Sequence, residues 1–201
     1  MMRRRYLTVA GLLLFLAAAI ASLGMVTAEA LYPAGYSTSK NAISDLGATE
    51  PPDSVAHQPS ATIFDSSMIV CGALALVASF CLQRGFRRWA VPILIALFAV
   101  GVLGVGVFPG NYGNVHALFA LLAFIAGGLA AIASVSIAAR PFGYLGILLG
   151  AVSLVTLLLY LILGDSSPMA SLGLGGGERW IVYPIVLWIA GLGGHLMGRS
   201  R

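Results

Sequence analysis

The chain has 201 residues, of which 59% are hydrophobic and 9% charged. A soluble domain carries about a quarter charged residues, so this chain cannot cover itself with a water-facing surface. The formal net charge of +4 comes from arginines in short clusters beside apolar runs, which suit anionic lipid headgroups. Aromatic residues do not alternate with these arginines, as they would on a platform for stacked bases. The composition therefore excludes a soluble enzyme, gives no sign of nucleic-acid binding, and predicts an integral membrane protein.

Six apolar stretches are long enough, at about 20 residues each, to cross a bilayer. In chain order they cover residues 6–28, 62–82, 89–108, 115–138, 142–163 and 180–197. The prediction is an all-α, polytopic six-helix transmembrane bundle that occupies residues 1–201 as a single domain. The first stretch also resembles a cleaved signal peptide, because Arg3-Arg4-Arg5 precede it and Ala28-Glu29-Ala30 follow it. Its apolar run is longer than a signal core and long enough to span, which favours its retention as a helix.

The charged residues separate into two sets of loops. The acidic residues fall in one set: Glu29, Asp45, Glu50, Asp53, Asp65, Asp165 and Glu178. The basic clusters fall in the other: Arg3 to Arg5, Arg84, Arg87, Arg88, Arg140, Arg199 and Arg201. Basic residues are enriched on the cytoplasmic side of membrane proteins, so we expect a multi-pass protein of the plasma membrane with both termini in the cytoplasm.

The loops predicted on the outer side are the longer ones. Residues 29–61 make a loop of about thirty residues, well beyond the usual connection length, and residues 164–179 make a second one rich in glycine and serine. Non-helical backbone at membrane depth must be buried or line a wet cavity. The outer half of the bundle is therefore where a functional site is expected.

The first outer loop contains the segment Asn41-Ala42-Ile43-Ser44-Asp45-Leu46-Gly47. Its apolar residues flank Ser44 and Asp45, as in a segment that returns into the bundle, where polar groups must find partners. The alternative is a helix cap, in which Ser44 or Asp45 accepts hydrogen bonds from free backbone N–H groups. Asp65, near the outer end of the second span, is a carboxylate that is costly there unless it is paired or hydrated.

His116 opens the fourth span and is the histidine best placed at the outer end. It is a candidate acid or base, metal ligand, or hydrogen-bond partner for Asp45 or Asp65. His57 lies in the long loop and His195 near the opposite membrane face, so the three histidines cannot share one metal ion, and no HxxxH or HExxH spacing occurs. We expect neither a metal nor another cofactor.

Glu178 and Arg179 precede the sixth span, where an arginine on the outer side is unusual. Beside carboxylates, its planar guanidinium suits either an ion pair or a phosphate. Small residues at packing distance, Gly146 with Gly150 and Gly194 with Gly198, predict close helix contacts, either within one bundle, which we favour, or between two copies in a homo-oligomer.

These residues carry a family resemblance. Asn41 to Gly47, then Ile63-Phe64-Asp65, Gly106-Val107-Phe108-Pro109 with His116, and Glu178-Arg179 before Trp188 resemble the prokaryotic membrane family filed as domain of unknown function 998. The Ile-Ser-Asp-Leu-Gly motif is also similar to the damage-regulated autophagy modulators and to membrane factors of GPI-anchor remodelling. The resemblance implies a six-span bundle whose motif residues line the non-cytoplasmic half, and it implies no catalytic residue.

The sequence thus predicts an outward-facing polar pocket that binds a membrane lipid or another amphiphile. Its binding residues would be Asn41, Glu178 and Arg179, together with Ser44, Asp45, Asp65 and His116. The alternative is an intramembrane lipid hydrolase or transferase that uses His116 as base, with Asp45 or Asp65 to orient it. A second alternative, a small-solute transporter, is disfavoured because the spans hold almost no ionisable residues.

Overall fold

The computed structural model describes residues 2–198, without the side chain of Asp165. Its six long helices are α1 (Met2–Ala30), α2 (Ser60–Phe86), α3 (Ala90–Val107), α4 (Asn114–Ala133), α5 (Phe142–Leu163) and α6 (Gly173–Gly198). Each is long and apolar enough to cross a membrane when α4 and α6 are taken with the short turns beside them. No strand occurs in the described range. The prediction of an all-α, six-span bundle is confirmed. Two of the basic residues named above, Arg199 and Arg201, lie outside the described residues.

The start of α6 corrects the sequence prediction. The helix begins at Gly173 rather than near Trp180, so Glu178 and Arg179 lie within the helix and not in a loop. Gly173 has φ +71°, a conformation that glycine adopts without a steric cost. The N–H of Gly175 then donates to the carbonyl of Ser39 in the first loop at 3.0 Å. That tertiary partner satisfies a free N–H group of the helix start, which the local sequence alone could not supply.

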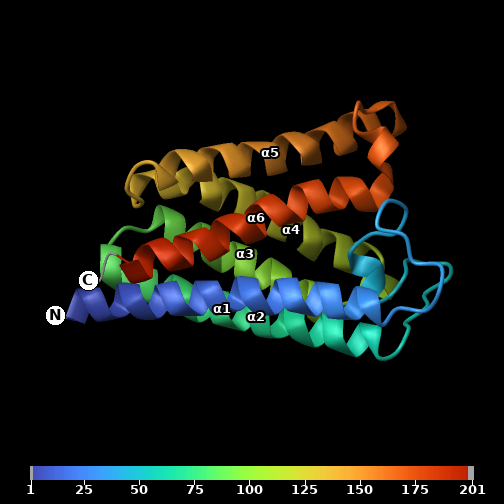
Figure 1. Cartoon of the computed structure of the whole chain (residues 1–201), viewed down its shortest axis with the longest axis horizontal. Coiled ribbons are helices and arrows are strands. Elements are labelled where there is room, and N and C mark those ends of the chain that lie inside the picture. Colours follow the sequence, from blue (N-terminus) through green and yellow to red (C-terminus); the bar gives the residue numbers. More distant parts are fainter. Residues whose placement is uncertain (1, 199–201) are drawn as a thin grey trace.

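The helices form a closed ring with one helix outside it. From α1 to α4, each helix packs against the next, and α6 returns to lie beside α1. A smaller contact between α4 and α6 closes the ring. α5 packs on the outside, against α4 and α6, and Figure 1 shows it at the edge of the bundle. The interior of the ring is therefore enclosed by α1, α2, α3, α4 and α6.

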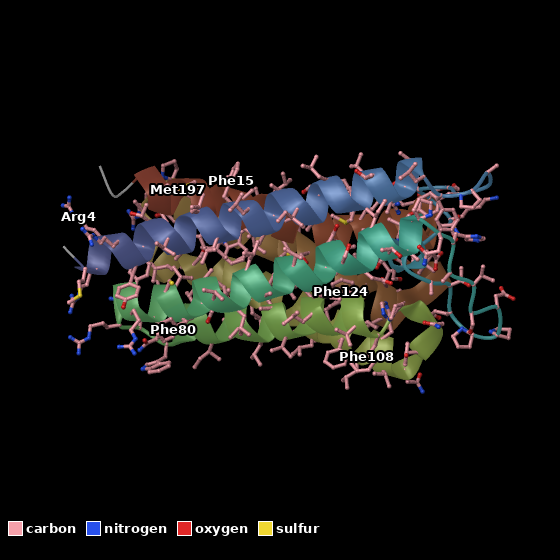
Figure 2. All side chains as sticks on the ribbon, turned by 90° about the horizontal axis from the view of Figure 1, so that it is seen from below. Arg4, Phe15, Phe80, Phe108, Phe124 and Met197 are labelled. Carbon is pink, nitrogen blue, oxygen red and sulfur yellow. The ribbon has the colours of Figure 1, made fainter. Side chains whose placement is uncertain are left out.

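The two ends of the bundle differ in chemistry. The start of α1 and the end of α6 lie at one end of the bundle, called here the terminal end (Figure 1). The long connections 31–59 and 164–172 lie at the other end, called the loop end. Figure 2 shows Arg4 at the terminal end and Phe108 at the loop end, with mostly carbon side chains between them. This is the distribution expected of a bundle whose middle lies in hydrocarbon.

Glycines bring the helices of the ring close together. A side chain at Gly146 or Gly150 of α5 would collide with the backbone of α4, so this pair serves packing within the chain. Gly194 and Gly198 of α6 face open space in the structure. An association between copies through that second pair stays a prediction.

Candidate functional site

The segment Asn41 to Gly47 of the first loop is folded into the loop end of the bundle. Residues Ser44–Leu46 form a short 3-10 turn, η1. The side chain of Leu46 is 0% exposed, and the neighbouring Ile43 is buried as well. The buried hydroxyl of Ser60, at the start of α2, donates to the carbonyl of Leu46 at 3.1 Å. The expectation that this segment returns into the bundle is confirmed.

Asp45 and Asn41 build the turn that carries this segment. One oxygen of Asp45, Oδ2, accepts from the side-chain amide of Asn41 and from the backbone N–H of Ala42, both at 3.1 Å. The Oδ1 of Asn41 accepts from the N–H of Ser37 at 3.0 Å. Asp45 thus accepts from donors that precede it in the turn and does not cap the start of a helix. It does not line the cavity described below.

Arg179 fastens this loop to α6. Its Nη1 donates to the carbonyls of Thr38, Asn41 and Gly175 at 2.8, 3.1 and 3.0 Å. Its Nη2 lies 3.3 Å from a carboxylate oxygen of Glu29, at the end of α1, in an ion pair. The sequence left open whether this arginine forms an ion pair or binds a phosphate. In the structure it forms the ion pair, and most of its N–H groups already donate to protein acceptors.

Tyr36 completes the contacts of the guanidinium. Nη2 of Arg179 donates to the Tyr36 hydroxyl at 2.7 Å, and that hydroxyl donates to the carbonyl of Ala42 at 3.2 Å. Burial raises the pKa of Tyr36 to about 12, even though the neighbouring guanidinium opposes this effect. The hydroxyl therefore keeps its proton at neutral pH and can donate. Sequence reasoning missed Glu29 and Tyr36 as part of this cluster; an acid at the end of a span was the available signal.

Glu178 points in another direction from Arg179. Its carboxylate accepts from the backbone N–H of Ile43 at 2.5 Å, and the N–H of Ser44 contributes a further hydrogen bond. Adjacent helical residues point about 100° apart, so one turn of α6 holds the loop from two sides. The side chain of Glu178 also lines the interior cavity.

His116, on the first turn of α4, is 3% exposed and faces the same cavity. Its Nδ1 lies 2.7 Å from the carbonyl oxygen of Phe108. A carbonyl can only accept, so in the neutral ring the proton sits on Nδ1 and Nε2 carries the free lone pair. The backbone of the α3–α4 connection thereby sets the tautomer of the imidazole.

Asp65 contacts the first loop. It packs against Gly47 of the loop, where an added side chain would collide with its Oδ1. That oxygen is buried and has no hydrogen-bond partner within the described range. Among the described residues, neither Asp65 nor Asp45 is hydrogen-bonded to His116, which bonds to the carbonyl of Phe108. A histidine oriented by either aspartate is thus not assembled in this structure.

The interior of the ring contains a cavity toward the loop end. The cavity has a volume of about 70 Å³, below the usual 300–1,000 Å³ of ligand pockets, so a molecule of that size fits only when side chains of the walls move apart. Three polar side chains line it: Ser44, His116 and Glu178. The remaining walls are apolar and come from α1, α2, α3, α4, α6 and η1: Ala18, Ala21, Met25, Ile43, Phe64, Met68, Cys71, Phe98, Val102, Val105, Ala120, Ala123, Phe124, Val182, Ile185, Val186 and Ile189.

The fold and this cavity define a multi-pass membrane protein with an apolar chamber and a few polar groups in its lining. A family model described as "Protein of unknown function (DUF998)" matches residues 7–195, and the chain belongs to this family. No curated protein and no solved structure shows a significant match to it. Among the described residues, no three His, Cys, Asp or Glu side chains come together in a way that could hold a metal ion.

Proposed function

We propose that the protein binds a membrane amphiphile in this chamber, with the apolar part of the ligand along the walls and its polar end near Ser44, His116 and Glu178. The observation that carries the proposal is the chemistry of the lining, which is apolar except for these three side chains. A ligand site of this kind is typically a mostly apolar concavity with a few polar groups that fix orientation. A water-soluble polar ligand would leave most of its own polar groups unpaired against such walls.

The carboxylate and the imidazole have different capacities in this role. Glu178 already accepts from the backbone of the first loop, so it holds that loop over the chamber. Its remaining lone pairs can accept hydrogen bonds from a ligand. His116 offers Nε2 as an acceptor for a ligand hydroxyl or amide. A lipid headgroup with a hydrogen-bond donor therefore fits the polar part of the lining better than one with acceptors alone.

The test is lipid analysis of the purified protein by native mass spectrometry. Ala120→Phe places a ring in the chamber, while Ala117→Phe, on the same helix, places the same ring on an exposed surface. We expect co-purified lipid to be lost in the first variant and retained in the second. Equal lipid retention by both variants, with both folded, would show that the chamber does not hold the ligand.

The polar side chains of the chamber also support a second candidate function, the hydrolysis or transfer of an acyl ester. Ser44, His116 and Glu178 line one chamber. Nε2 of His116 carries a lone pair that could take the proton of a nucleophile, either a water or the Ser44 hydroxyl, while that nucleophile attacks an ester. This would make the protein a lipid hydrolase or transferase. Incubation with a fluorogenic acyl ester in mixed micelles tests it, with His116→Gln as the control that binds but cannot transfer the proton.

The proposed setting is the plasma membrane, with the terminal end in the cytoplasm, because the basic clusters lie at that end. Val55→Cys and Phe86→Cys, each in a chain with Cys71 and Cys81 replaced by serine, report on the two ends. An impermeant maleimide added to intact cells should label position 55 only. Labelling at position 86 alone would reverse the orientation.

A further inference from the structure

Close contacts at glycines pack the other seams of the helical ring. At each of them a glycine lets one helix approach the next so closely that any side chain would collide with the neighbour. The neighbour is backbone between α2 and α3 at Gly72 and Gly106 and between α3 and α4 at Gly101. Between α1 and α2, Gly24 meets the side chain of Ser67, and between α4 and α6, Gly127 meets the side chain of Ile185. The α4–α6 seam is also covered from outside by α5. An acyl chain cannot pass through seams packed in this way.

The seam between α1 and α6 is packed backbone to backbone only in its terminal half, and the Glu29–Arg179 ion pair joins the two helices again at the loop end. In the terminal half, Gly11 and Gly193 face each other, and a side chain on either would meet the carbonyl of the other. Figure 2 labels Phe15 and Met197, the neighbours of this contact. Toward the loop end, α6 runs away from α1 (Figure 1). Pro184 lies in this part of α6 and lacks the N–H that would hold the preceding turn, which favours a bend there.

An open groove lies between α1 and α6 where the two helices diverge. Its walls are Ser22, Met25 and Val26 of α1 and Tyr183, Val186 and Leu187 of α6. Met25 and Val186 also line the interior chamber, so the groove and the chamber meet at these two side chains. The outward rim of the groove is apolar, with Val26 64% and Leu187 63% exposed. In a bilayer this rim faces lipid chains.

In contrast to the groove, the loop end of the chamber is closed by the first loop. The segment around η1 is buried and is bonded to α6 through Glu178 and Arg179 and to α2 through Ser60. At the opposite end the core is filled by fully buried side chains, among them Leu14, Leu82 and Leu192. Access from water at either end would require these contacts to break.

The geometry points to a lateral portal between α1 and α6, through which the acyl chain of a bilayer phospholipid enters the chamber from the leaflet at the loop end. This inference rests on the proposed function and narrows its ligand to a molecule that partitions into the membrane. The Glu29–Arg179 ion pair lies about one turn beyond the groove on both helices. While its chain enters through the groove, a phospholipid therefore keeps its headgroup near that polar cluster, at the level of water. Once the lipid is bound, its polar end lies near Ser44, His116 and Glu178.

Photocrosslinking in vesicles tests the portal. The full-length protein is reconstituted in phosphatidylcholine and phosphatidylglycerol with a phosphatidylglycerol that carries a diazirine near the end of one acyl chain, and adducts are mapped by mass spectrometry. We expect adducts on the chamber walls at Phe124 and Val102 in the native protein. Val186→Trp and, independently, Met25→Trp should abolish these wall adducts, because the indole fills the junction. Val155→Trp, on the exposed face of α5, is the matched control and should retain them.

The outcomes separate the portal from the chamber. Adducts on the exposed groove residue Leu187 should persist in both blocked variants, which shows that the probe still reaches the protein and that the fold is intact. Wall adducts at the native level in both blocked variants would overturn the portal and leave the chamber as a lipid site. Absence of wall adducts from the native protein, with groove adducts present, would overturn the proposed function itself.

Discussion

Replacing Arg179 with methionine tests how the first loop is held over the chamber. The substitution keeps most of the side-chain length but removes the guanidinium. The carbonyls of Thr38 and Asn41 then lose donors at 2.8 and 3.1 Å, and Glu29 loses its ion-pair partner at 3.3 Å. These contacts tie α6 to residues 141 and 138 positions away in the chain. Their loss should free the loop while leaving the six helices in place.

The expected cost follows from burial. A hydrogen bond to a charged group contributes about 1.5–3 kcal/mol, and bonds that share one group are not additive. Breaking a buried ion pair costs about 3–5 kcal/mol because the remaining charge is stranded. The carboxylate of Glu29 is 31% exposed, so water can hydrate it in the variant. We therefore expect a loss of about 3 kcal/mol, which for a chain of this size lowers Tm by about 6–12 °C.

Two measurements read this out in detergent. Scanning fluorimetry gives Tm, and maleimide labelling of Ala48→Cys, in a chain without Cys71 and Cys81, reports whether the buried loop has opened. Arg84→Met is the control, because that guanidinium lies over the exposed ring of Phe80 and contributes about 0.5–1 kcal/mol. If Arg179→Met melts with the control and position 48 stays unlabelled, the arginine does not hold the loop and the reasoning is refuted.

Three further outcomes are expected. Asp45→Ala removes the acceptor for two donors in the turn and should cost about 1–3 kcal/mol, whereas Asp53→Ala, at an exposed loop position, should leave Tm within about 1 °C. Gly175→Ala should lower Tm strongly because its methyl group meets the carbonyl of Asn41, while Gly194→Ala, which faces open space, should not; equal Tm values would contradict this packing. His116→Gln should retain bound lipid in native mass spectrometry, and any turnover of an acyl ester should fall by about 10²–10⁴-fold.

Local sequence patterns predicted only part of the arrangement of side chains in the site. The segment around Ser44 was placed correctly inside the bundle, because apolar residues on both sides of a polar pair must be buried. The pairing of His116 with Asp45 or Asp65 could not be tested in sequence, and neither contact forms in the described structure. Chain spacing does not encode which way each side chain turns once the loop has docked.

The sequence by itself determined the six spans and the separation of acidic and basic ends. Both follow from composition within a window of about 20 residues, since a bilayer imposes a fixed length and excludes charge. Tertiary structure alone decided that α6 begins at Gly173, that Arg179 turns to Glu29 while Glu178 turns to the chamber, and that α1 and α6 touch at Gly11 and Gly193 and then diverge. These features join segments more than 130 residues apart, where backbone packing between helices, and not local preference, sets the free energy.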